Sequence, residues 1–501
     1  MGNKLISILK EQNDFKLTEN GAVAKSTTGT KLLDLFALGG AYRKRSDEDC
    51  ILLFKNAYDE NPGYAMKCLF YLRDVRGGQG ERRFFRVCMR WLASYDKKAA
   101  DRNLQYVSEF GRWDDLYIFE GTSLEANAFN IIIEQLALDV QCKTPSLLAK
   151  WLKSENTSSA ESRRLAAITR RYLQMTSKQY RKTLTILRER IRVLEKLMSA
   201  NRWDEIEFDK IPSKAGLKYK NAFARRDMIK AKYEAFAKSG TTKVNAKTLY
   251  PYECVDAAKK CWNNSIENVD RLMVNKYWDN LANYFNDCEL NALAVVDTSA
   301  SMTWGGTPHP IDIAISLGLY CAEKAKGPFH GNYISFSKNA RLVPTAGIDF
   351  CDKVKRIYQT NLCQNTDIES VFNLILETAV IHKLKQEDLP QSLVIISDME
   401  VDQGSLNVSY HIRNGVRTDA NTQILTLMDK IRAKFNDYGY EMPKLIYWNV
   451  NARQDTILDI SPDASFVSGA SPSIFQSIMK GKTQIDLMYD VLNKERYACI
   501  K

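Results

Sequence analysis

The spacing of apolar residues changes once along the chain, near residue 285. Before that point apolar residues recur at steps of three and four, as in Cys50–Tyr58 and Ile131–Leu138, which predicts amphipathic helices. Breaks containing proline or glycine separate these segments at residues 61–63, 77–80 and 143–145. Segments of helical length with short breaks indicate stacked helical hairpins, although no fixed repeat period is present. We therefore predict an all-α helical-repeat (HEAT-like) domain over residues 1–285 and leave open whether it closes into a ring.

A second pattern begins near Glu289. Leu293–Val296 is a continuous apolar run, which is typical of a central parallel strand buried on both faces. Further strands are predicted at Gly331–Ser337, Arg341–Pro344, Ser392–Ser397, Leu445–Val450 and Ser465–Ser468. Helices are predicted at Pro310–Lys326, Ile368–His382, Asn421–Phe435 and Pro472–Ile500. This alternation predicts a doubly wound α/β domain over residues 286–501, with its site at the carboxyl ends of the strands. The fold class is therefore α followed by α/β.

Polar residues follow the predicted strands in a pattern that suits a hard cation. Asp297, Ser299 and Ser301 come directly after the first strand, Asp398 follows the strand at Ser392–Ser397, and Thr366 precedes a helix. Alternate residues of an extended loop point the same way, so Asp-x-Ser-x-Ser places three oxygens on one side. Mg²⁺ takes about six oxygen ligands and usually keeps several waters. The alternative is that these residues only cap the helices that follow them.

This constellation resembles the metal-ion-dependent adhesion site (MIDAS) of the von Willebrand factor A domain, over about 200 residues. The resemblance implies a divalent cation, most simply Mg²⁺, with Ser299, Ser301 and Thr366 contacting the metal and Asp297 and Asp398 often acting through water. It also implies an open coordination position for an acidic group of a partner.

Charge is distributed unevenly along the chain, whose net charge is +11. Residues 151–250 contain 24 lysines and arginines against 10 acidic residues, whereas Glu289 to the end has 21 against 24. Basic helices often have only solvated faces, but an excess of this size in one window is typical of a polyanion-binding surface, most commonly for nucleic acid.

Several motifs of the predicted helical domain resemble the TROVE module of the Ro autoantigen family. In that family a helical domain is joined to a von Willebrand A domain. The motifs are Arg73–Arg82, Phe110–Leu116 and Ile211–Ala215 with the basic run through Asp227, and the closest pattern is the TROVE-like domain-of-unknown-function 2828 family. Asn449–Arg453 and Val467–Gly469 fit the same family. The resemblance implies a ribonucleoprotein component that binds single-stranded RNA ends and small structured RNAs.

The residues that we expect to contact RNA are basic side chains in or near these motifs: Arg73, Arg76, Arg82, Arg83, Arg112, Arg163, Arg164, Arg170, Arg171, Lys178, Arg181, Lys214, Lys218, Lys220, Arg225 and Arg226. Aromatic residues interleaved with them could stack on bases, namely Tyr172, Tyr180, Trp203, Tyr219, Phe223 and Tyr233. The alternatives are that most of the aromatic residues are core, and that some of the first arginines pair with Asp74 and Glu81. Gly77–Gly80 lacks the Gly-Lys-Ser/Thr ending of a phosphate loop and is interpreted as a helix–helix turn.

Three function classes remain open. We favour a non-catalytic RNA-binding protein; a metal-dependent protein-interaction adaptor without RNA is the main alternative, and an Mg²⁺-dependent nuclease using Asp297 and Asp398 is a minor one. No nucleophile–base set is evident among the four histidines, so we do not expect an enzyme. Eleven cysteines without a Cys-x-x-Cys pair, no signal-like start and no long apolar run favour a cytoplasmic protein with no membrane segment.

Overall fold

A computed structural model describes most of the chain: residues 14, 16–246, 248–285, 291–304, 306–336, 339–360, 366–402, 427–459, 461, 464–478 and 483–501. Its contacts divide the chain into two compact units, each drawn from separate sequence segments. Unit 1 comprises the described parts of Met1–Ala65, Tyr250–Asn263 and Ala282–Asn493. Unit 2 comprises Met66–Leu249, Asn264–Leu281 and Lys494–Lys501. Our division at residue 285 followed the change of apolar pattern, whereas these units follow contacts.

Unit 1 is built on a six-stranded sheet of order β5-β4-β3-β6-β7-β8. Its strands are parallel except for the edge strand β5, which pairs antiparallel with β4. The strands are β3 (Ala292–Asp297), β4 (Asn332–Phe336), β5 (Arg341–Pro344), β6 (Ser392–Ser397), β7 (Lys444–Asn449) and β8 (Ala464–Ser468). Every residue of β3 is buried, as expected for a central parallel strand with helices on both faces.

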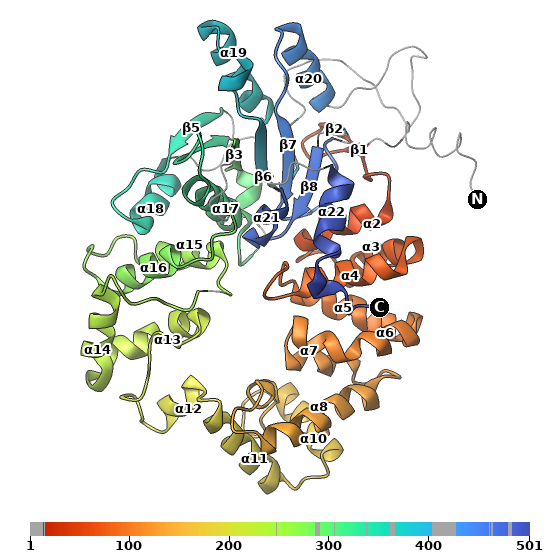
Figure 1. Cartoon of the computed structure of the whole chain (residues 1–501), viewed down its shortest axis with the longest axis vertical. Coiled ribbons are helices and arrows are strands. Elements are labelled where there is room, and N and C mark those ends of the chain that lie inside the picture. The colour runs from red at the N-terminus through yellow and green to blue at the C-terminus, as the bar shows by residue number, and fades with distance from the viewer. Residues whose placement is uncertain are drawn as a thin grey trace. The chain divides into compact units, whose positions relative to one another are not determined.

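Helices cover this sheet (Figure 1). They are α17 (Pro310–Lys324), α18 (Phe350–Thr360), α19 (Glu369–His382), α20 (Leu427–Asp437), α21 (Phe475–Ile478) and α22 (Gln484–Leu492). Short 3₁₀ turns add η4 (Ala300–Thr303), η5 (Gln386–Asp388) and η6 (Pro472–Ile474). α17 packs closely on β3, because a Cβ on Gly318 would lie 2.3 Å from Cγ2 of Val296. The predicted fold class, a helical N-terminal region followed by a von Willebrand A-like α/β domain, is confirmed.

The start of the chain contributes to this unit as well. β1 (Lys16–Leu17) pairs with β2 (Val23–Ala24), and α2 (Lys31–Leu38) packs on β8. The turn after α2, η1 (Gly39–Ala41), lies directly on that strand: the Gly40 amide donates to Oγ of Ser468 at 3.0 Å, and a Cβ on Gly40 would lie 2.7 Å from the Ser468 carbonyl oxygen. α3 (Asp47–Glu60) packs on α2, and α15 (Pro251–Lys259) packs on α17 and α18. The first 285 residues are therefore not helical throughout.

Unit 2 consists of helices in its described residues, and α4 (Pro62–Arg73) is the helix in which the division between the units falls. Its other helices are α5 (Arg82–Tyr95), α6 (Lys97–Asn103), η2 (Leu104–Tyr106), α7 (Val107–Phe110), η3 (Trp113–Phe119), α8 (Glu125–Gln141), α9 (Leu148–Trp151), α10 (Ala160–Tyr172), α11 (Ser177–Arg190), α12 (Leu194–Ser199), α13 (Ser213–Arg225), α14 (Asp227–Lys238), α16 (Val269–Asp279) and η7 (Glu495–Tyr497). Gly77–Gly80 joins α4 to α5, as predicted for a helix–helix turn.

One predicted element differs from the structure, and one observed helix was not predicted. The continuous helix expected over Pro472–Ile500 is instead a series of short helices, and α22 ends where Asn493 leaves the helical conformation. The helix α18 was not predicted, because most of its residues are polar and its apolar positions form only a narrow stripe. The buried residues of that stripe are Phe350, Cys351, Val354 and Ile357. The first part of the helix expected over Asn421–Phe435 lies outside the described residues, which resume with α20.

Candidate functional site

Two buried carboxylates lie side by side at the carboxyl edge of the unit 1 sheet. β3 ends at Asp297 and β6 is followed by Asp398, and the two strands are parallel neighbours. Asp297 is fully buried and Asp398 is 1% exposed. The topology of the sheet therefore brings together two acidic residues that lie 101 positions apart in the sequence.

The loop after β3 turns its oxygens toward the first carboxylate. The Ser299 amide donates to Oδ1 of Asp297 at 2.9 Å, and the Ser397 hydroxyl donates to Oδ2 at 2.5 Å. The hydroxyls of Ser299 and Ser301 are 3.0 Å apart. Ser299 and Ser301 thus lie together, although Ser301 is part of the 3₁₀ turn η4 and not of the extended loop on which the prediction was based.

Thr366 lies at the start of the loop that leads into α19, and it is buried. The Asp402 amide donates to its carbonyl oxygen at 2.9 Å, which ties this loop to the segment that follows β6. The Asn20 amide nitrogen is 3.5 Å from the Thr366 hydroxyl. Residues 361–365, including the Asn365 that precedes Thr366, lie outside the described part of the chain.

Burial and mutual repulsion make both carboxylates unfavourable as anions. Burial, and then the charge of Asp398, raise the pKa of Asp297 above its ordinary value. Burial also raises the pKa of Asp398, although the nearby Arg453 opposes this effect. A cation between the two groups would compensate both charges.

Four residues near this edge were not predicted. Nη2 of Arg453 lies 3.1 Å from Oδ2 of Asp398, and its Nη1 pairs with Glu19 at 2.6 Å. Glu400 accepts from the Glu19 amide at 2.7 Å, and its carbonyl accepts from the Asn20 side chain at 2.6 Å. Arg453 and Glu19 are remote from Asp398 in sequence, so only the fold reveals them. Glu400 follows Asp398 by two residues, so its place near the site is the one that could have been predicted from the sequence.

The donor set suits a hard divalent cation. Oδ2 of Asp398 is buried and has no hydrogen-bond partner among the described residues, since Arg453 is within ion-pair distance but not in hydrogen-bond geometry. Asp297, Asp398, Ser299, Ser301 and Thr366 together offer the carboxylate and hydroxyl oxygens that Mg²⁺ prefers. No cluster of three or more His, Cys, Asp or Glu that could hold a metal occurs in the described ranges, so such a site would depend on hydroxyl ligands.

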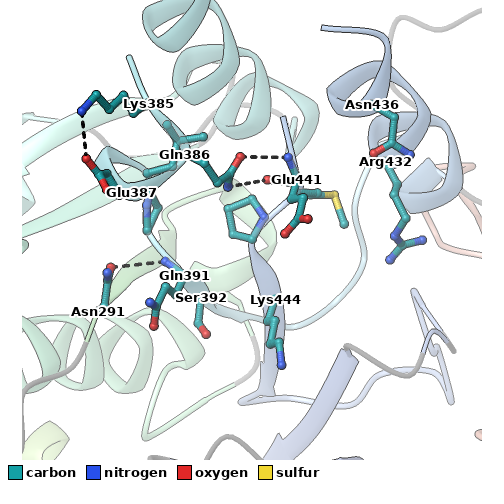
Figure 2. A pocket seen from close by; sticks show the side chains of 14 residues that line it. Asn291, Lys385, Gln386, Glu387, Gln391, Ser392, Arg432, Asn436, Glu441 and Lys444 are labelled. Carbon is teal, nitrogen blue, oxygen red and sulfur yellow. Dashed lines mark hydrogen bonds and ion pairs between the residues drawn. The ribbon is translucent and has the colours of Figure 1, made fainter. Parts of the chain in front are cut away.

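The opposite, amino edge of the same sheet contains a cavity of about 1110 Å³. Figure 2 shows that several polar groups in its lining bond to each other. Gln386 exchanges two hydrogen bonds with the backbone of Glu441, at 2.9 and 3.1 Å, and Lys385 pairs with Glu387. These groups bond to each other, whereas the carboxyl edge holds two adjacent buried carboxylates and an Asp398 oxygen that accepts no hydrogen bond among the described residues. The carboxyl edge is therefore the stronger candidate site.

Most of the predicted RNA-binding residues are on the surface of unit 2. Arg76, Arg83, Arg163, Arg164, Arg171, Lys178, Arg181, Lys218, Arg225 and Arg226 are exposed, and Arg82, Arg112, Arg170, Lys214 and Lys220 are half-buried. Several of them form ion pairs within the protein: Arg164 pairs with Glu120, Arg170 with Glu155, and Lys220 with Asp270. Only Arg73 is buried, so it cannot contact RNA in this structure.

Two of the first arginines have other partners than the alternative names. Arg73 pairs with Asp115 at 2.7 Å and Arg82 pairs with Asp114, whereas Asp74 pairs with Arg496. The Asp114–Asp115 pair lies in the first turn of η3. Its buried carboxylates also neutralise arginines from α4 and α5.

Most of the aromatic residues belong to the core. Tyr180, Trp203, Phe223 and Tyr233 are at most 4% exposed, and Phe223 and Tyr233 pack around Phe208. Tyr172 is stacked on Phe129, with ring centroids 4.3 Å apart. These rings are therefore occupied by packing, and base stacking on them is not supported.

The described helices include none with the length and apolar character needed to cross a membrane.

The fold and the carboxyl-edge site define a protein of two parts, a helical region and a von Willebrand A-like α/β region. A family model described as "Domain of unknown function (DUF2828)" matches residues 18–121 and 137–288, and one described as "Domain of unknown function (DUF7788)" matches residues 291–497. The chain belongs to the DUF2828 family, the TROVE-like family, as predicted.

Two individual proteins are similar to this chain. The Uncharacterized protein L728 of Acanthamoeba polyphaga mimivirus is 30% identical over 514 residues, which cover 94% of this chain and 85% of the relative. The Ro (RSR) protein of Deinococcus radiodurans has a crystal structure that matches with a TM-score of 0.44 and 14% identity, over 91% of this chain and all of that one.

Proposed function

We propose that this protein binds RNA through the basic surface of unit 2 and catalyses no reaction. The observation that carries the proposal is the excess of 14 positive charges in residues 151–250, together with the exposure of its basic side chains on α10, α11 and α13. Exposed cations at this density attract the phosphate backbone and gain free energy by releasing its counterions. The adaptor alternative does not require such an excess.

The carboxyl edge of the unit 1 sheet gives the protein a second proposed activity. Asp297, Ser299, Ser301, Thr366 and Asp398 would hold Mg²⁺, and an acidic group of a protein partner would bind at the metal. Oδ2 of Asp398, which is buried and ion-paired to Arg453 but accepts no hydrogen bond among the described residues, supports this proposal. The bound cation would supply the attraction for that acidic group, and the protein residues would hold the cation in place.

The RNA-binding proposal predicts a steep salt dependence. The affinity of the protein for RNA should fall with salt, with a log–log slope of roughly −0.7 per phosphate contact. Replacing the exposed Lys178, Lys218 and Arg225 with glutamate should make this slope shallower by about 2, because up to three contacts are lost. A gel-shift titration at several salt concentrations measures both slopes.

A matched variant controls for net charge. Glutamate at Arg356, Lys385 and Lys444, which are exposed in unit 1, changes the net charge by the same amount. Its slope should equal that of the wild type. Equal slopes for all three proteins would move the assignment to the adaptor alternative.

The two proposed activities should be separable, because the metal residues belong to unit 1 and the basic helices to unit 2. EDTA should therefore change the RNA affinity of the full chain less than about threefold, which is under about 0.7 kcal/mol. RNA incubated with the protein and Mg²⁺ should also stay intact on a denaturing gel. A loss of affinity of about tenfold or more, or cleaved RNA, would favour the nuclease alternative.

A further inference from the structure

Two consecutive buried aspartates organise a cluster of cations in unit 2. Asp114 and Asp115 lie at the start of η3 and are 4% and 0% exposed. Arg73, at the end of α4, donates twice to Oδ2 of Asp115, at 2.7 and 3.0 Å. Arg86, from α5, donates to Oδ1 of Asp115 at 2.6 Å. Both oxygens of Asp115 are thus bonded to arginines, which makes this pair the structural centre of the cluster.

Asp114 is shared by more cations than it can neutralise. Its Oδ2 atom accepts from Arg82 and lies 3.4 Å from Nη2 of Arg86 and 3.5 Å from Nζ of Lys153. Nε of Arg82 lies 3.5 Å from Oδ1 of Asp115 but forms no hydrogen bond among the described residues. Oδ1 of Asp114 likewise accepts no hydrogen bond there. The outer part of this network therefore retains unused bonding capacity, unlike its centre.

A fifth cation increases the imbalance. The Arg112 guanidinium lies over the Trp151 ring, 4.5 Å from its centroid. Burial, followed by the positive charges of Arg73 and Arg82, lowers the pKa of Arg112, while Asp114 and Asp115 oppose this effect. Five cations lie around two carboxylates here, and Glu161 is within electrostatic range of Lys153, so positive charges remain in excess.

The excess charge faces solvent. The side chains of Arg82, Arg86 and Lys153 are 40%, 29% and 28% exposed, whereas Arg73 is 1% exposed. An arginine presents N–H groups in a planar fork that matches two phosphate oxygens, and a lysine adds a point charge. The buried aspartates hold these groups in position, which reduces the entropy lost when an anion binds.

We propose that Arg82, Arg86 and Lys153 form a binding site for a phosphate group of an RNA strand. The identity of the strand as RNA depends on the proposed function, whereas the phosphate chemistry depends on the cluster alone. The site lies outside the basic window of residues 151–250 except for Lys153. It also assigns to Arg86 and Lys153 a role that their sequence context does not suggest.

The test uses the full chain with Arg82→Gln, Lys153→Gln and the double variant. The double variant should bind a single-stranded RNA oligonucleotide at least about tenfold more weakly, since hydrogen bonds to charged groups are lost. Its salt slope should be shallower by about 0.7, because the site neutralises one phosphate of the strand. Arg356→Gln is the matched control, because Arg356 is 57% exposed, is ion-paired to Asp352 and belongs to unit 1, outside both the cluster and the basic window. It should change RNA affinity less than about twofold.

A second measurement separates this site from RNA binding as such. Inorganic phosphate at constant ionic strength should raise the thermal midpoint of the wild type and of Arg356→Gln, but not that of the double variant. RNA binding by the double variant equal to that of the control would overturn the site while the proposed function stands. Phosphate stabilisation without any RNA binding by the wild type would overturn the proposed function and leave an anion site.

Two further outcomes are decisive. Adenosine monophosphate that competes as well as an RNA oligonucleotide of equal phosphate concentration would identify a free nucleotide as the ligand and overturn the RNA assignment. Lys153→Gln tests the site even if Arg82→Gln fails to fold. The Lys153 side chain is linked to the aspartates only by its ion pair with Asp114, at 3.5 Å, so its replacement should leave the fold intact. Unchanged RNA affinity in that folded variant would remove Lys153 from the site.

Discussion

Asp115→Ala should lower the free energy of unfolding of unit 2 by about 3–5 kcal/mol, because it leaves buried charge without a partner. Arg73 is 1% exposed and donates two hydrogen bonds to Asp115, and Arg86 donates a third. The backbone amide of Arg112 also loses its acceptor at 2.9 Å. Urea-induced unfolding followed by circular dichroism measures the effect as a lower transition midpoint.

The control for this variant is Glu161→Ala. Glu161 also pairs with an arginine, Arg164, but its side chain is 63% exposed, so water replaces the lost contact. Its removal should cost less than about 1 kcal/mol. Similar midpoints for the two variants would show that the Arg73–Asp115 pair does not support the helical unit.

Asp297→Ala should weaken Mg²⁺ binding by at least about 10–100-fold in titration calorimetry, the loss typical even for outer-shell partners of a metal. It removes the carboxylate to which the Ser299 amide and the Ser397 hydroxyl donate. In the absence of metal the variant should remain folded, because the mutation removes one of two buried charges and leaves the apolar residues of β3 intact. Mg²⁺ should therefore raise the thermal midpoint of the wild type but not of the variant.

Thr366→Ala provides a second variant at the same site, and Glu387→Ala removes an exposed carboxylate at the opposite edge of the sheet. The first should lose Mg²⁺ affinity and the second should keep it. Wild-type protein that binds neither Mg²⁺ nor Mn²⁺ would refute the metal site. Equal affinity in wild type and Asp297→Ala would refute the assignment of Asp297.

The elements that could be predicted from the sequence are those with a strong local signal. β3 and β6 are continuous apolar runs, so their positions and the acidic residues at their ends follow directly from the pattern. The strand order that makes them neighbours, and hence brings Asp297 beside Asp398, follows only from the doubly wound fold class.

The rest of the site depends on contacts between remote segments. Arg453 contacts Asp398 and also pairs with Glu19, near the start of the chain, and no local spacing indicates such a meeting. Arg73 was predicted to lie on the surface because it is a basic residue in a basic motif. In the structure it is buried and paired with Asp115. Burial could not be distinguished from exposure where charged residues alternate with apolar ones.

The packing of α2 on β8 has a consequence for the order of events during synthesis. α2 covers residues Lys31–Leu38, and its buried face includes Leu35 and Phe36, which are at most 2% exposed in the finished protein. Its partner strand begins only at Ala464. At about 5–20 residues per second a ribosome needs roughly 20–90 seconds to reach that strand. Throughout that interval the apolar face of α2 lacks its sheet, and chaperone occupancy of the nascent chain should therefore begin at α2 and end when β8 emerges.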